Sequence, residues 1–194
     1  MDTTHIEVPA QRGASAKITA AIGLAVALVG LVFALNTSDA PSHWYAAFKL
    51  IHVAVAVFWV GGGLVLTVLA LKAERSGDPV DMATIARQAA FVGERFFAPA
   101  GLVVLAMGIT MVINDHIGFG TTWVDIGLAG YAATFTTGIG FLSPRAKKIA
   151  TLLEQKGAEA AETQAEIQRI LLIARVDVGV LLLVVADMLM KPFS

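Results

Sequence analysis

Long apolar segments constrain this chain more than any other feature. Five windows of about 18 to 25 mostly apolar residues run through it, at 18–35, 45–71, 96–113, 123–142 and 170–190. A helix rises 1.5 Å per residue, so about 20 such residues cross the ~30 Å hydrocarbon core of a bilayer. A lone strand would leave backbone groups unsatisfied in lipid. The sequence therefore predicts an all-α, polytopic membrane helix bundle with five transmembrane helices, a four-helix core plus an N-terminal span.

The composition agrees with residence in a bilayer. Hydrophobic residues make up 57% of the chain and charged residues only 15%, with a mean hydropathy of +0.74, outside the range of soluble domains. We expect a polar tail, 1–17, followed by a single membrane domain, 18–194, surrounded by lipid. Membrane-protein partners or a homo-oligomer are further expectations. Nucleic acid is not expected, because the basic residues are explained by topology.

The basic residues predict one orientation in the membrane. All lysines and arginines except Lys49 and Lys191 fall in the tail, in the loops 72–95 and 143–169, or at the start of the last span, whereas 36–44 and 114–122 have none. Basic loops favour the cytoplasmic side. We therefore expect a cytoplasmic N-terminus, with both basic loops inside.

Both cytoplasmic loops carry helix signals. Asp78 before Pro79 is typical of a helix start, and the helix that follows is expected along the inner surface, continuous with the third span. Ser143 before Pro144 predicts a second start, and Gly157 predicts an interruption of that helix.

Ionisable residues inside spans are candidate site residues, because burying a charge in lipid costs free energy. They form an outer layer, with His52, Lys49, Asp125, Asp187 and Lys191, and an inner layer. Within the outer layer we expect Asp187 to pair with Lys191 or Lys49.

The inner layer contains Glu94, Arg95, Arg175 and Asp177. We expect Asp177 to pair with Arg175 or Arg95 in a network that fixes helix orientation, with a proton path as the alternative.

His52 is the central candidate of the outer layer. It shares a helical face with Lys49, Trp59 and Gly63 in KLIHVAVAVFWVGGG. Two interpretations stay open: an interhelical hydrogen bond, or ligation of a metal or haem iron by neutral imidazole.

Methionines in the outer halves of the third and fifth spans favour ligation, because thioether and imidazole suit Cu(I) or a His/Met haem. We name Met111 and Met188 as cofactor ligands beside His52, with Lys49, Asp187 and Asp125 around them. His43 and His116 on the same outer side are further candidate metal ligands, although loop histidines without close spacing are more often simple surface residues.

Several chemistries lack their residues. The chain has no cysteine, which excludes disulfides, thiolate metal sites and cysteine nucleophiles. Metalloprotease, P-loop, serine-hydrolase and dinucleotide motifs are also missing from the sequence. No catalytic residue is therefore assigned.

Three segments carry a family resemblance: KLIHVAVAVFWVGGG (49–63), FFAPAGLVVLAMGITMVI (96–113) and DMLMKP (187–192). With them the chain resembles a family of predicted integral membrane proteins of bacteria. That family is similar to the copper-resistance D membrane proteins and, more distantly, to the oxygen-independent protoporphyrinogen oxidase membrane family. The resemblance implies a bacterial plasma membrane location and a metal or haem at His52.

Three functions follow as hypotheses. The first is a non-enzymatic membrane protein with a haem b or copper site in the outer leaflet, centred on His52. The second is a structural or accessory subunit of a membrane complex without a cofactor. The third is a porphyrin-oxidising membrane enzyme.

Overall fold

The structure, a computed structural model, describes residues 42–192, and these form helices with no strand among them. The predicted tail 1–17 and span 18–35 lie outside the described residues. The helices are α2 (Ser42–Ser76), α3 (Pro79–Val92), α4 (Ala98–Asn114), α5 (Thr122–Thr137), α6 (Ser143–Lys156) and α7 (Ala161–Met190), with π-helical turns η1 (Gly93–Phe97) and η2 (Gly138–Leu142). The all-α prediction is therefore confirmed for this part of the chain.

The π turns join neighbouring helices into long rods. Trp44–Ser76, Pro79–Asn114 and Thr122–Lys156 are three helices long and apolar enough to cross a membrane within the described residues. Each has 33 to 36 residues, or about 50 Å at 1.5 Å per residue, so it also extends beyond a ~30 Å hydrocarbon layer. The predicted continuity of the first basic loop with the third span is confirmed. α7 holds Arg175, Asp177 and Asp187 in its apolar part and is not among these three.

Two of the predicted helix boundaries are confirmed. The Asp78 carboxylate accepts a hydrogen bond of 2.8 Å from the Val80 N–H, so Asp78 caps α3 as expected. Gly157 ends α6 with a positive φ of 81°, a conformation that glycine adopts without steric cost.

The predicted helix start at Ser143 coincides with the first residue of α6, but no side chain caps it and the rod from α5 continues through this position. Pro144 lacks an N–H, and its ring would clash with the carbonyl four residues earlier in a regular helix. In η2 the Ser143 N–H donates to the Gly138 carbonyl five residues back, which widens the turn. The same bond joins the Ala98 N–H to the Gly93 carbonyl ahead of Pro99 in η1. Each proline is thus accommodated inside a continuous rod.

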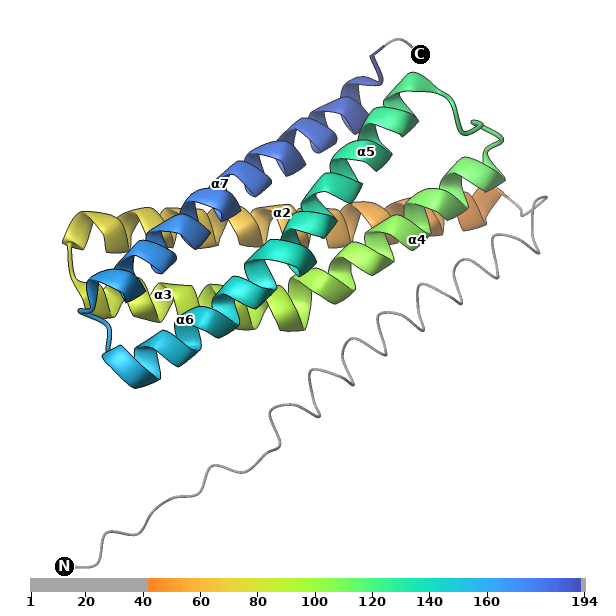
Figure 1. The fold of residues 1–194 in the computed structure, drawn as a ribbon. Coiled ribbons are helices and arrows are strands. Elements are labelled where there is room, and N and C mark those ends of the chain that lie inside the picture. The colour runs from red at the N-terminus through yellow and green to blue at the C-terminus, as the bar shows by residue number, and fades with distance from the viewer. Residues whose placement is uncertain (1–41, 193–194) are drawn as a thin grey trace, which may run out of the picture.

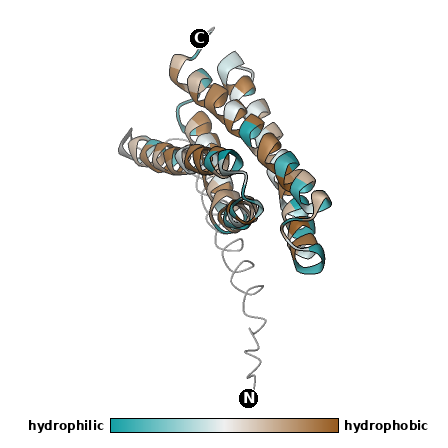
Figure 2. Cartoon of the chain, turned by 90° about the vertical axis from the view of Figure 1, so that its left-hand side faces the viewer, coloured by the Kyte–Doolittle hydropathy of each residue, from teal (hydrophilic) through white to brown (hydrophobic). Residues whose placement is uncertain are grey.

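The rods form two antiparallel hairpins. α2 packs along α3 and α4, and α7 packs along α5 and α6, while α4 and α5 contact each other little. Figure 1 shows the two hairpins crossing, with the α5 and α7 ends near the C-terminus turned away from α2. The ribbon in Figure 2 is hydrophobic along much of both hairpins, with hydrophilic residues interspersed.

Glycines and one tryptophan bring α2 close to its neighbours. A methyl group on Gly63 would lie 2.9 Å from Cγ2 of Val178 in α7, which is too close for carbon atoms. The buried Trp59 ring fills the space over Gly101 of α4, where a methyl group would lie 3.2 Å from it. The helical face that His52 shares with Trp59 and Gly63 therefore serves close helix packing.

A compact base forms where α2, α3, α6 and α7 meet, with fully buried Ile167 in its core. The first basic loop thus packs against other helices instead of lying alone along the inner surface. Glu166 accepts hydrogen bonds from Arg145 (2.6 Å) and Lys148 (2.7 Å). These two bonds hold the pKa of Glu166 below its usual value, the Lys148 bond contributing most.

Candidate functional site

His52 lies in the interface between α2 and α4. Its Nδ1 is 2.8 Å from the Val104 carbonyl oxygen, and because a carbonyl only accepts, Nδ1 carries the proton. Gly108 lies beside the ring, and a methyl group there would be 3.2 Å from Cε1. The imidazole is therefore held in one tautomer, in which Nε2 keeps its lone pair. The interhelical bond expected under the packing interpretation is present, and the same geometry is the usual one for a ligating histidine.

Met111 lies in the same interface as His52. It packs against a cluster of Phe48 from α2 with Ala106 and Met107 from α4. The structure thus brings one of the two predicted methionine ligands to the α2–α4 interface.

Met188 lies in the other hairpin. It packs against Trp123 and Val124 of α5, and its methyl group occupies the space left by Gly127. The neighbouring Asp187 is 7% exposed, and neither carboxylate oxygen accepts a hydrogen bond from a described residue. Met188 and Asp187 therefore belong to the α5–α7 interface, apart from the α2–α4 interface that holds His52.

The predicted ion pairs of Asp187 were wrong for the described residues. Lys191 ends α7 in a left-handed conformation and places its Nζ 4.8 Å from the centre of the Trp123 ring. Such a contact stabilises an ammonium group through the ring quadrupole. Lys49 is exposed and forms no ion pair with Asp187.

The remaining outer candidates do not converge on His52. Asp125 is exposed and accepts a 3.2 Å hydrogen bond from the Gly120 N–H, which stabilises the turn before α5. His116 is exposed in the same turn, and the side chain of His43 lies outside the described residues. Across residues 42–192, no three His, Asp or Glu side chains gather closely enough to hold a metal ion.

The inner layer pairs differently from the prediction. Arg175 forms an ion pair with Glu74 of α2, and not with Asp177, because its long side chain reaches along α7 to the neighbouring helix. Asp177, half-buried, has no hydrogen bond or ion pair with a described residue. The Glu94 carboxylate accepts a 3.2 Å hydrogen bond from the Ser143 hydroxyl, which joins η1 to the first residue of α6.

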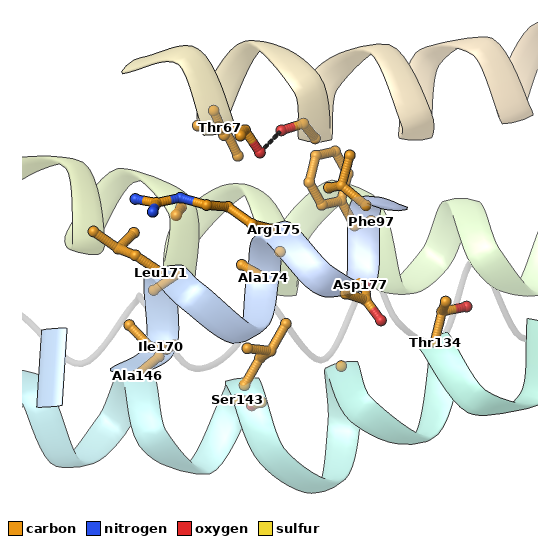
Figure 3. Close-up of a pocket in the computed structure, with 18 of the residues that line it drawn as sticks. Thr67, Phe97, Thr134, Ser143, Ala146, Ile170, Leu171, Ala174, Arg175 and Asp177 are labelled. Atoms are coloured by element: carbon orange, nitrogen blue, oxygen red, sulfur yellow. Dashed lines mark hydrogen bonds between the residues drawn. The ribbon is translucent and has the colours of Figure 1, made fainter. Parts of the chain in front are cut away.

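A cavity of about 170 Å³ lies among the helical rods, and Glu94, Arg175 and Asp177 are part of its lining. All four rods contribute to its wall, which includes the first glycine of each π turn, Gly93 and Gly138. Figure 3 shows Arg175 and Asp177 of α7 directed to opposite sides of it. Sequence reasoning missed this cavity. The available signal was a glycine six residues before a proline inside two predicted helices, Gly93 before Pro99 and Gly138 before Pro144.

The fold, with its long apolar helices, is that of a polytopic α-helical membrane protein. A family model described as "Predicted integral membrane protein (DUF2269)" matches residues 46–192, which is most of the chain. The chain belongs to this family. Comparison with curated proteins and with solved structures gave no match.

The family match confirms the resemblance to predicted integral membrane proteins. The further similarity to copper-resistance D proteins and to the porphyrin-oxidising membrane family stays a prediction, as does the bacterial inner membrane as location.

Proposed function

We propose that this protein is a multi-pass protein of the bacterial plasma membrane that holds a haem b or a copper ion at His52. The observation that carries the proposal is the 2.8 Å hydrogen bond from Nδ1–H of His52 to the Val104 carbonyl, which leaves Nε2 available as a ligand. Met111 in the same interface supplies a thioether of the kind that Cu(I) and haem iron accept. These donors are of the kind that would hold a soft metal ion or a haem iron.

His52 would hold the group through Nε2, and the Val104 carbonyl would fix the ring orientation. A bound haem b would supply one-electron redox chemistry. Gly108 leaves room for the ring on the α4 side, since a methyl group there would lie 3.2 Å from Cε1 of His52.

The test is an absorption spectrum with copper analysis of gently solubilised full-length protein. Haem b predicts a Soret band and copper predicts stoichiometric metal, and either should be lost in His52→Ala. His116→Ala removes an exposed histidine from the outer turn and should leave the cofactor in place. A colourless wild-type preparation without stoichiometric copper would refute the proposal.

A second candidate is an accessory subunit of a membrane complex, in which His52 only joins helices. The same His52–Val104 hydrogen bond favours it, because the bond links α2 to α4 without any ligand. His52→Asn separates the two functions, since its amide still donates to the carbonyl but ligates iron poorly. Under the accessory function, His52→Asn retains co-purifying partners and His52→Ala loses them; under the cofactor function, both variants lose the cofactor.

The proposed topology has five spans and a cytoplasmic N-terminus. It rests on the basic residues of the α2–α3 and α6–α7 ends and on the absence of lysine and arginine from 114–122. The cysteine-free chain allows a direct test with single cysteines at two exposed positions, Phe119→Cys and Glu159→Cys. An impermeant thiol reagent added to intact cells should label position 119 and not 159. The reverse pattern would overturn the orientation.

A further inference from the structure

The cavity between the hairpins is separate from the His52 interface. It is lined by residues of α2, α3, η1, α4, α5, η2, α6 and α7, and His52 is not among them. At about 170 Å³ it exceeds the ~150 Å³ of an apolar protein cavity that accepts benzene. The space therefore suits a molecule with one ring.

The π turns create this space. A methyl group on Gly93 or Gly138 would meet no atom within 4 Å, so neither glycine is required for close helix packing. Both glycines line the cavity and begin a π turn, a distortion that is found frequently at functional sites. At these two positions the cavity wall therefore carries no side chain.

The charged side chains on the cavity wall differ in whether a neighbouring residue compensates their charge. Arg175 is engaged by Glu74, so its charge is compensated within the protein. Asp177 has no ion pair or hydrogen bond with a described residue, and among residues 42–192 Glu94 accepts a hydrogen bond only from the neutral Ser143 hydroxyl. In Figure 3 Asp177 points toward Thr134 of α5, across the space between the helices. An uncompensated carboxylate in an apolar setting favours a cation as its partner.

Aromatic rings complete the wall. Trp59, Phe97 and Phe135 line the cavity, and Tyr131 contacts both Trp59 and Phe135 with ring centroids 6.1 Å and 5.4 Å apart. Aromatic faces attract organic cations, and they do so more strongly where water is excluded. Aromatic rings and a carboxylate, here that of Asp177, are the groups that recognise an ammonium group attached to an apolar molecule.

A second hollow gives access from the bilayer. It lies between α5 and α7 and shares Thr134 and Asp177 with the cavity. Leu172 and Val176 on its rim are exposed apolar side chains of α7. A lipid-dissolved molecule can therefore reach Asp177 from the side of the bundle.

From these observations we infer that the cavity is a binding site for a small organic cation, a single-ring amine or quaternary ammonium, which enters from the bilayer between α5 and α7. Asp177 neutralises its charge, and the rings of Trp59, Phe97 and Phe135 contact its apolar part.

Binding is tested with benzyltrimethylammonium, a permanent single-ring cation, by calorimetric titration of full-length protein in nanodiscs. Neopentylbenzene, its neutral isostere, and benzenesulfonate, an anion, serve as comparison probes. The cation should bind saturably and at least about tenfold more tightly than either, a difference of ~1.4 kcal/mol. Tighter binding of benzenesulfonate would overturn the inference and assign the site to Arg175.

Two variants locate the site. Asp177→Asn should weaken cation binding about tenfold or more, whereas Asp125→Asn removes the same charge from an exposed turn and should leave it unchanged. A methyl group on Gly138 meets no atom within 4 Å, so Gly138→Leu should occupy space at the cavity wall and abolish binding, while Gly140→Leu in the same π turn lies off the wall and should not.

Gly138→Leu decides the question if Asp177→Asn does not fold. Wild-type protein without saturable cation binding, or binding that Gly138→Leu leaves unchanged, would overturn the inference. His52→Ala should bind the cation normally, so this site and the proposed cofactor site fail or succeed separately.

Discussion

The ion pair between Arg175 and Glu74 gives the sharpest energetic prediction. Their side chains are 25% and 28% exposed, so the pair is about three-quarters removed from solvent. Two unit charges ~4 Å apart at an effective dielectric constant of about 20 attract by ~4 kcal/mol. Desolvation offsets part of this attraction, whereas fully exposed pairs give only ~0–1 kcal/mol. We therefore expect a coupling free energy of about 2 kcal/mol.

The assay is a double-mutant cycle in mixed micelles, with unfolding induced by SDS and followed by circular dichroism. Glu74→Gln and Arg175→Gln are measured singly and together, and the non-additive part of the unfolding free energy is the coupling. A second cycle replaces Glu74→Gln with Asp177→Asn, which removes the partner expected from sequence.

The second cycle should give a coupling below about 0.5 kcal/mol, because Asp177 and Arg175 form no ion pair. A larger coupling of Arg175 to Asp177 than to Glu74 would refute the reasoning from the structure. Such a coupling would also mean that Arg175 compensates the charge of Asp177, which would weaken the case for a bound cation.

Three further predictions concern packing and pH. Gly63→Leu should destabilise the protein by about 1–3 kcal/mol because Val178 blocks the added side chain, while Gly61→Leu, at a position where a methyl group meets no atom within 4 Å, should stay within about 0.5 kcal/mol of wild type in the same SDS titration. The pKa of Glu166 is lowered in the folded protein, so its contribution to stability is full above about pH 4.5 and is lost as the pH falls through the folded-state pKa; melting temperatures should show this loss in wild type and not in Glu166→Gln. Trp123→Leu should cost about 0.5–1 kcal/mol beyond lost burial through the Lys191 contact, and in a Lys191→Met background this extra cost should vanish.

Local signals in the sequence predicted much of the fold. The Asp78–Pro79 start, the end of α6 at Gly157 and the helical spans of the described region depend on residues close in sequence. The sequence did not show that the rod continues through Ser143, because the effect of Pro144 depends on whether a π turn can accommodate it. The π turn before Pro144 contains Gly138 and Gly140, which a helix-propensity argument reads only as weak positions.

The candidate sites were less predictable, because they depend on which helices meet. Helical spacing placed His52, Trp59 and Gly63 on one face, and the structure buries Trp59 there. It could not show that the Val104 carbonyl would meet His52, or that Met188 would pack in the other hairpin. Arg175 likewise paired with a glutamate 101 positions away, a choice set by the crossing of α2 and α7.

The two hairpins have a consequence for biogenesis. The α2–α4 hairpin is complete before α5 is synthesised. The turn between α4 and α5 exposes Phe119 and the glycines on either side of it. Each hairpin can therefore insert as a unit, with docking through Gly63 and Val178 as a later step. A chain divided within the turn at 115–121 should then reassemble from two co-expressed fragments, which makes the molecule suitable for a split reporter of membrane-protein assembly.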